Sequence, residues 1–174
     1  MRKNHDTILA LDPGLRELGY AVLTGTRLVT SGVLSLHTAP THQRLRMIKE
    51  SMGAWGRAYR PRTLVLESIP NRPLDSIGGL PALGRFLRRH ARRRRIKLAS
   101  YSAKAVRRSV VGNGWAGKRE VADAIAARFP ELRVHLKQVT KSRQNHWANM
   151  YDAVALALHH QSLRQPPSRS RFSD

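Results

Sequence analysis

The spacing of apolar residues changes from segment to segment along the chain, and each spacing predicts a different element. The run 7–11 is apolar and ends in a turn, and the segments 19–23 and 28–36 follow it with glycines between them. Short apolar runs with this punctuation are typical of neighbouring strands in a meander. In 41–59 the apolar residues instead recur every three to four positions, which predicts a helix.

The middle of the chain continues with alternating strands and helices. The segment 63–66 is apolar throughout, as expected of a strand that is covered on both faces. The segment 69–81 is rich in Pro and Gly, which predicts an irregular surface loop. Beyond it we expect a helix over 82–93, a strand over 96–100, helices over 102–110 and 118–128, and a last helix that contains 153–158.

The order of these elements indicates the fold class. Three strands and a helix, followed by strands and helices in alternation, predict an α/β domain with a mixed sheet flanked by helices. The last helix is apolar on every side between Ala153 and Leu158, so we expect it to be buried. We assign the domain to residues 1–161. Residues 162–174 mix Pro, Ser and Arg without an apolar period, and we expect a flexible basic tail there.

The charge of the chain indicates a polyanionic partner. There are 32 Lys and Arg against 11 Asp and Glu, a net charge of +21, while 41% of the residues are hydrophobic and can form a core. Arg92–Arg95 form the densest basic run, and although such a run is often only a solvated helix face, one face does not account for +21. We therefore expect nucleic acid, bound through phosphate contacts that weaken with salt.

Several classes of protein are excluded. The chain has no cysteine, so it is not a disulfide scaffold, a zinc ribbon or an enzyme with a thiol nucleophile. Its first apolar run is too short for a signal peptide, and no stretch approaches the about 20 apolar residues of a membrane span. We expect an intracellular, cytoplasmic protein.

In a chain with so few acids, a carboxylate in apolar surroundings needs a reason, and three acids qualify. Asp12 ends the first strand, where Asp-Pro-Gly also makes a good turn. Glu67 ends the strand 63–66 and could be a simple exposed strand end. Asp152 opens the buried helix and could interact with its dipole, but an acid entering an apolar helix would be desolvated and need a partner.

Together the three acids fit a metal site. The functional crevice of an open α/β sheet lies beyond the carboxyl ends of its strands, so parallel neighbouring strands would bring Asp12 and Glu67 to one edge. Asp152 would join them from the helix. Converging carboxylates repel one another unless a cation lies between them, and oxygen ligands favour Mg²⁺ or Mn²⁺ over zinc. A basic protein with two such ions would be expected to hydrolyse phosphodiesters.

Four segments resemble a known family. Ile8–Gly14 with Leu18–Val22, Leu64–Glu67, Ala105–Lys118 and Asp152–Ala157 are similar, in order, to segments of the RuvC-type Holliday junction resolvases. The similarity extends over about residues 7–160. The resemblance implies an RNase H-like fold with a five-stranded sheet, and paired metal-dependent nicks in a four-way DNA junction. It also implies a homodimer, whose two-fold axis would present equivalent sites to the two strands, with a branch-migration helicase as a candidate partner.

The resemblance also assigns roles within the site. By position, Asp12, Glu67 and Asp152 match three metal-binding acids of the family, which would hold two Mg²⁺ ions. Lys118 matches its active-site lysine, which could stabilise charge on the transferring phosphate; the alternative is a surface lysine at a helix start.

The fourth metal ligand of the family is Asp or His, three residues before the last Asp, where this chain has Asn149. Asn149 shares a helix face with Asp152 and could reach an ion as a neutral ligand. His146 is a candidate general base for water, provided that the helix begins after it. The alternative for both residues is a helix-cap or surface role.

Two further departures concern DNA contacts. After Glu67 the family often carries an aromatic, where this chain has Pro70, and Arg107 replaces a lysine. Trp115 in the Gly turn is a candidate to stack on a base instead, although a buried Trp is the commoner outcome. The residues that we expect to contact DNA are Arg72, Arg88, Arg89, Arg92, Arg93, Arg94, Arg95, Arg107, Arg108 and Trp115.

Two other functions fit the same features. One is a less specific branched-DNA or flap endonuclease on this fold, which the replaced aromatic and the high charge favour. The other is a nucleic-acid-binding module without catalysis, for which Asn149 at the fourth ligand position is the support. Cleavage assays with Mg²⁺ on junctions, flaps and duplex would separate the three.

Overall fold

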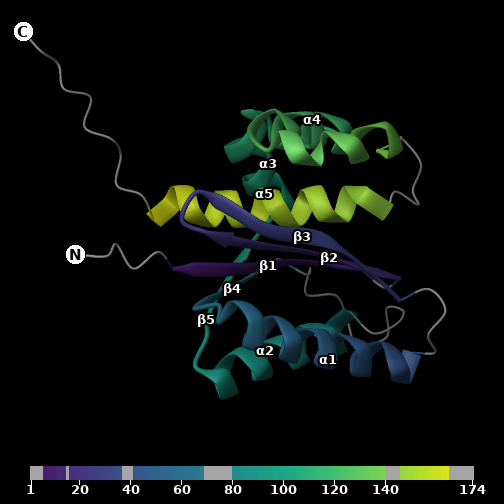
Figure 1. Ribbon diagram of the computed structural model, residues 1–174, viewed down its shortest axis with the longest axis vertical. Coiled ribbons are helices and arrows are strands. Elements are labelled where there is room, and N and C mark those ends of the chain that lie inside the picture. The colour runs from purple at the N-terminus through teal and green to yellow at the C-terminus, as the bar shows by residue number, and fades with distance from the viewer. Residues whose placement is uncertain (1–5, 15, 37–40, 69–79, 140–145, 165–174) are drawn as a thin grey trace, which may run out of the picture.

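The computed structural model describes residues 6–14, 16–36, 41–68, 80–139 and 146–164. Its centre is a five-stranded sheet with the strand order β3-β2-β1-β4-β5 (Figure 1). The strands are β1 (Thr7–Pro13), β2 (Glu17–Thr24), β3 (Arg27–Ser35), β4 (Thr63–Glu67) and β5 (Lys97–Tyr101). β1, β2 and β3 pair antiparallel, whereas β4 runs parallel to both β1 and β5. The mixed five-stranded sheet expected from the sequence is confirmed.

The helices also follow the predicted order. They are α1 (Thr41–Tyr59), α2 (Leu80–Arg94), α3 (Ala103–Val111), α4 (Lys118–Arg128), the 3-10 helix η1 (Pro130–Gln138) and α5 (His146–Arg164). α1 and α4 have the predicted bounds. α3 begins one residue late because Ser102 is its N-cap and accepts a hydrogen bond from the Ala105 amide. In the part of the chain that the structure describes, no helix is long and apolar enough to span a bilayer.

Some boundaries differ from the prediction. Pro81 belongs to α2 and not to the preceding loop, since the first turn of a helix tolerates proline; the rest of that loop, 69–79, lies outside the described residues. The helix η1 was not predicted. α5 continues three residues past the domain boundary expected at Gln161, whose buried amide Nε2 donates to the carbonyl of Gly25. Residues 165–174 of the expected tail lie outside the described residues.

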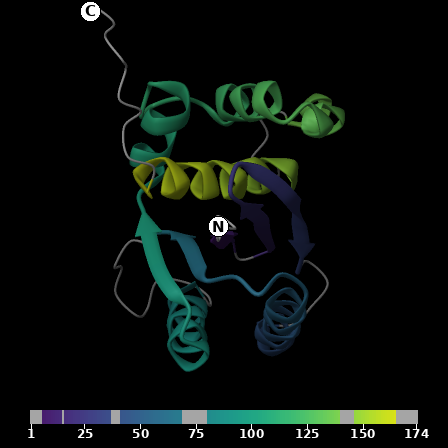
Figure 2. The same ribbon diagram turned by 60° about the vertical axis from the view of Figure 1, so that its left-hand side comes forward.

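Different helices cover the two faces of the sheet (Figures 1 and 2). Alternate residues of a strand face opposite sides, so Ile8 and Ala10 of β1 join one hydrophobic cluster while Leu9 and Leu11 join the other. The first face carries α5, with α3 and α4 packed on the outer side of that helix. The second face carries α1 and α2. Burial on both faces explains why the four residues Ile8–Leu11 of β1 are all apolar.

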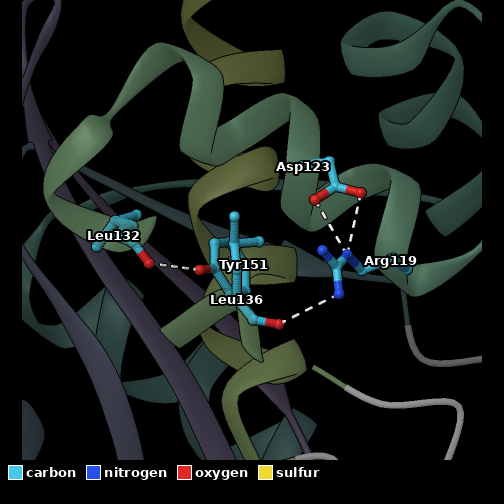
Figure 3. A network of polar contacts seen from close by, with 5 residues as sticks. All are labelled: Arg119, Asp123, Leu132, Leu136 and Tyr151. Carbon is cyan, nitrogen blue, oxygen red and sulfur yellow. Dashed lines mark hydrogen bonds and ion pairs between the residues drawn. The ribbon is translucent and has the colours of Figure 1, made fainter. Parts of the chain in front are cut away.

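Polar contacts anchor α5 above the sheet. Its centre, 153–158, is buried as predicted. Tyr151 is fully buried, and its hydroxyl donates a 2.6 Å hydrogen bond to the carbonyl of Leu132 in η1 (Figure 3). Burial raises the pKa of Tyr151 to about 12, which keeps the hydroxyl a donor. Arg119 of α4 binds η1 as well, through the Leu136 carbonyl at 3.5 Å. The Tyr151 hydrogen bond thus joins α5 to η1 at the residue directly before Asp152, and the Arg119 contact joins η1 to α4.

Candidate active site

Two carboxylates, Asp12 and Glu67, lie at the carboxyl ends of the parallel neighbouring strands β1 and β4. The pairing between β1 and β4 is parallel, as expected, and it ends at Leu11 and Leu66, directly before Asp12 and Glu67. Asp12 comes two residues after Ala10, and Glu67 two residues after Val65, and both of these apolar residues face α5. The two acids therefore belong to the face of the sheet that α5 covers.

The third carboxylate reaches this edge through a close contact between α5 and β2. Gly19 of β2 is the cross-strand partner of Asp12. A Cβ atom at Gly19 would lie 2.0 Å from the Asn149 carbonyl oxygen, so a larger residue would push α5 away. Asp152 lies three residues after Asn149, on the same helix face. The prediction that Asp152 opens the helix is wrong: it lies in the second turn, beyond the reach of the helix dipole.

The three carboxylates influence one another's protonation. Burial, with the charges of Asp152 and Glu67, raises the pKa of Asp12 well above its ordinary value. Burial and the Asp152 charge raise the pKa of Glu67, and burial raises that of Asp152. The cations of Lys118 and Arg107 lower all three pKa values but do not outweigh these effects. The cluster therefore favours additional positive charge.

Lys118 and Arg107 reach the carboxylates from the helices beyond α5. Lys118 is the first residue of α4, and its Nζ lies 3.8 Å from Oδ2 of Asp152, with the lysine side chain 47% and the aspartate side chain 15% exposed. Arg107 extends from α3, on the other side of the Gly turn. Lys118 thus lies beside Asp152, and its part in the reaction stays a prediction.

The donor set suits a hard divalent cation but does not enclose one. Its oxygen atoms are the ligands that Mg²⁺ prefers, and burial together with the neighbouring carboxylates raises the pKa values of Asp12 and Glu67. Within the described residues, however, no three His, Asp or Glu side chains stand close enough to hold an ion between them. That Asp12, Glu67 and Asp152 share metal ions stays a prediction.

A fourth acid beside this cluster, Glu17, was missed in the sequence. Its side chain is 13% exposed, and its Oε1 lies 2.8 Å from Nδ1 of His146. Its Oε2 accepts a 3.3 Å hydrogen bond from Nδ2 of Asn149. Glu17 begins the buried strand β2, so the rule that selected the other acids would have found it. His146 and Asn149 do lie near the site, but both engage Glu17.

His146 does not meet the condition under which it was expected to act as a general base. We expected His146 to serve as a general base only if the helix began after it, and α5 begins at His146 itself. Its ring is held by Glu17 of β2, so the helix does not aim it at Asp152.

Trp115 differs from expectation. A buried tryptophan was the commoner outcome, but Trp115 is 78% exposed. The small residues on either side, Gly114 and Ala116, are the ones that are buried, so the larger side chain between them points outward.

The basic residues expected to contact DNA lie on two different layers. Arg107 and Arg108 belong to α3, on the side of the carboxylates. Six arginines in the second half of α2 and directly after it are exposed on the opposite layer: Arg88, Arg89, Arg92, Arg93, Arg94 and Arg95. Between α1 and α2 a groove of about 900 Å³ is lined by basic side chains, among them Arg46, Lys49, Arg89 and Arg93. Arg72 and Pro70 lie outside the described residues.

The chain is similar in sequence to known enzymes over most of its length. Residues 8–160 match the family model described as crossover junction endodeoxyribonuclease RuvC. The crossover junction endodeoxyribonuclease RuvC of Pseudomonas paraeruginosa is 30% identical over 163 residues, covering 91% of this chain and 87% of the relative. The protein of the same name from Maricaulis maris is 30% identical over 174 residues, covering 92% of this chain and 93% of the relative.

Solved structures share the fold. Thermus thermophilus RuvC in complex with Holliday junction substrate superimposes with a TM-score of 0.66 at 24% identity, covering 90% of this chain and 93% of that one. The yeast mitochondrial Holliday junction resolvase gives a TM-score of 0.60 at 14% identity, covering 90% and 78%. The expected RNase H-like fold is confirmed.

Proposed function

The chain belongs to the RuvC family of crossover junction endodeoxyribonucleases. We propose that it resolves four-way (Holliday) DNA junctions by paired nicks in the DNA, with Asp12, Glu67 and Asp152 as the acids of the metal-dependent active site. The observation that carries the proposal is the convergence of these acids. Two come from the ends of parallel strands and one from α5, on one face of the sheet, with Lys118 and Arg107 beside them.

We propose Mg²⁺ as the metal, with two ions per site and Mn²⁺ as a substitute. Asp12, Glu67 and Asp152 would supply charged oxygen ligands, and Asn149 a neutral one if its amide turned away from Glu17. When bound, the ions supply Lewis-acid activation of the attacking water and of the leaving oxygen. The mutual repulsion of the carboxylates supports this role, because bound cations would relieve it.

The basic residues have two proposed tasks. Lys118 and Arg107, next to the carboxylates, would hold the non-bridging oxygens of the cut phosphate and stabilise the charge that develops there. Arg108 and the arginines of α2 would bind phosphates further along the DNA arms. Glu17, which holds the His146 ring through Nδ1, would position the start of α5 at the site.

A homodimer is part of the proposal. Resolution needs one cut in each of two strands that are related by a two-fold axis, and a symmetric pair of chains would place one site at each. A branch-migration helicase is the class of protein partner that would deliver the junction. We propose that the enzyme acts inside the cell, where its DNA substrate is found.

A synthetic immobile four-way junction tests the function. We expect cuts in two opposed strands with Mg²⁺, none with EDTA, and much weaker cleavage of flaps and duplex at physiological salt. Equal cleavage of flaps would favour the less specific nuclease. Tight junction binding without any cleavage, in either Mg²⁺ or Mn²⁺, would favour the binding module.

A further inference from the structure

The turn between α3 and α4 presents an aromatic ring to solvent, three residues before Lys118. Trp115 is 78% exposed, and among the described residues only Leu98, Val134 and Leu163 are further large hydrophobic side chains classed as exposed. An exposed indole offers a large apolar surface to a partner, so its surroundings indicate which partner fits.

The backbone around Trp115 is held in place from both sides. The Trp115 amide donates a 2.9 Å hydrogen bond to Oδ1 of Asn113, and the Ala116 amide donates to the Asn113 carbonyl at 3.2 Å. A Cβ atom at Gly114 would lie 2.8 Å from Cγ of Lys104, so the turn packs directly on α3. The ring is therefore presented by an ordered turn, and little conformational entropy would be lost when a partner binds.

A cation covers one face of the ring. Nζ of Lys104 lies 4.2 Å from the ring centroid, within the range of a cation–π contact. Because the side chain is still 78% exposed, the other face of the indole is open. An open aromatic face next to an ammonium group matches a nucleotide, whose base stacks and whose phosphate is negative.

The same two elements also carry the cations of the acidic cluster. Arg107 follows Lys104 by one turn of α3, and the two share a helix face. Lys118 follows Trp115 by three residues, and its Nζ lies 3.8 Å from Oδ2 of Asp152. A DNA strand whose phosphate lies at the carboxylates would therefore pass close to Trp115.

We infer that Trp115 is a stacking platform for one unpaired base of the strand that is cut, with Lys104 as the positioning residue for the ring and a contact for the neighbouring phosphate. The inference rests on the proposed function, because it takes the cut strand as the ligand. It adds a contact with a base to a site that otherwise offers carboxylates and cations. A base that leaves the stack next to the crossover would offer its face to the open side of the indole.

The inference is tested by combining Trp115 variants with junctions that lack a single base. Immobile junctions would carry an abasic nucleotide at one position at a time around the crossover, and single-turnover cleavage would be measured at saturating enzyme with Mg²⁺. We expect Trp115→Ala to slow cleavage of the intact junction at least about fivefold, and Trp115→Phe to slow it less. Leu163→Ala, which removes another exposed apolar side chain about 16 Å along α5 from Asp152, should leave the rate unchanged.

At the stacked position, loss of the base should slow the wild-type protein by a similar factor and should not slow Trp115→Ala any further. A wild-type rate for Trp115→Ala would overturn the inference. The inference would also be overturned if, at every position, the abasic nucleotide slowed Trp115→Ala by the same factor as the wild type. The ring and the base would then act independently.

A metal-free measurement separates this inference from the proposed function. With 2-aminopurine at the stacked position, binding in EDTA should quench its fluorescence for the wild type and Trp115→Phe but not for Trp115→Ala. Quenching without junction cleavage in Mg²⁺ would refute the nuclease proposal and leave the platform standing. Cleavage without quenching at any position would refute the platform alone. A change in the sedimentation of DNA-free Trp115→Ala would refute it too, by making the ring a protein contact.

Discussion

Glu17 Oε1 lies 2.8 Å from His146 Nδ1, which ties the start of β2 to the first residue of α5 across 129 positions of sequence. The other carboxylate oxygen holds Asn149 at 3.3 Å, one turn before Asp152. A single acid thus holds His146 and Asn149, which lie six and three positions before Asp152 in α5.

Glu17→Gln should lower the free energy of unfolding by about 1–2 kcal/mol and slow junction cleavage, because the neutral amide holds His146 and Asn149 less firmly. Chemical denaturation and single-turnover cleavage would measure the two effects. Glu50→Gln is the matched control. Glu50 is an exposed acid on α1, and the ion pair found for it in the described residues is with Arg46, one turn away on the same helix. If Glu17→Gln unfolds and cleaves as Glu50→Gln does, the link has no role in positioning.

Asp12→Asn should abolish cleavage and leave junction binding intact, because it removes a metal ligand but no phosphate contact. Without metal it should also raise the melting temperature at neutral pH, since burial and two neighbouring carboxylates disfavour the charged Asp12. Mg²⁺ should stabilise the wild-type protein clearly and the variant much less. Thermal melts in EDTA and in Mg²⁺, with binding assays in Ca²⁺, check these outcomes. A parallel loss of binding would contradict the assignment.

Tyr151→Phe should cost about 1–3 kcal/mol of stability, because the buried Leu132 carbonyl loses its 2.6 Å donor. The phenylalanine retains the packing of the ring, so cleavage below the melting transition should fall only modestly. Denaturant unfolding measures the first effect and cleavage at low temperature the second. Stability equal to that of the wild type would mean that α5 is positioned by its apolar contacts alone.

Replacing Arg92–Arg95 by Ala should weaken junction binding and reduce the dependence of the dissociation constant on salt, while the affinity for Mg²⁺ stays unchanged. These arginines lie on the layer opposite the carboxylates, so they can act only on remote parts of the DNA. Binding isotherms over a series of salt concentrations give the slope. A slope like that of the wild type would mean that the run only faces solvent.

His160→Gln should reduce the loss of stability that the protein shows as the pH falls. Burial, together with Arg164 and His159, lowers the pKa of His160, whose Nδ1 lies 2.7 Å from the Tyr101 hydroxyl. The unfolded chain therefore takes up the proton first, and the wild type should lose stability as the pH falls below about 6.5. The difference in melting temperature between wild type and variant, followed from pH 8 downward at about half-unit steps, isolates this histidine from the carboxylates. A constant difference over that range would contradict the prediction.

The strands, the α-helices and two of the three carboxylate positions could be predicted from the sequence, whereas the 3-10 helix η1 could not. Apolar spacing gives the period of each strand and helix, because burial of one or both faces requires it. Asp12 and Glu67 could be placed together because the ends of parallel neighbouring strands meet at one edge of the sheet.

The contacts between distant segments could not be predicted from the sequence. The environment of Glu17 depends on the approach of α5 to Gly19, and the start of α5 decides that Asp152 lies in its second turn. The exposure of Trp115 follows from the packing of its small neighbours on α3, and the layer of the arginine run follows from the face of the sheet that α2 covers. These features arise between segments far apart in the chain, where the local spacing of residues carries no information about which surfaces meet.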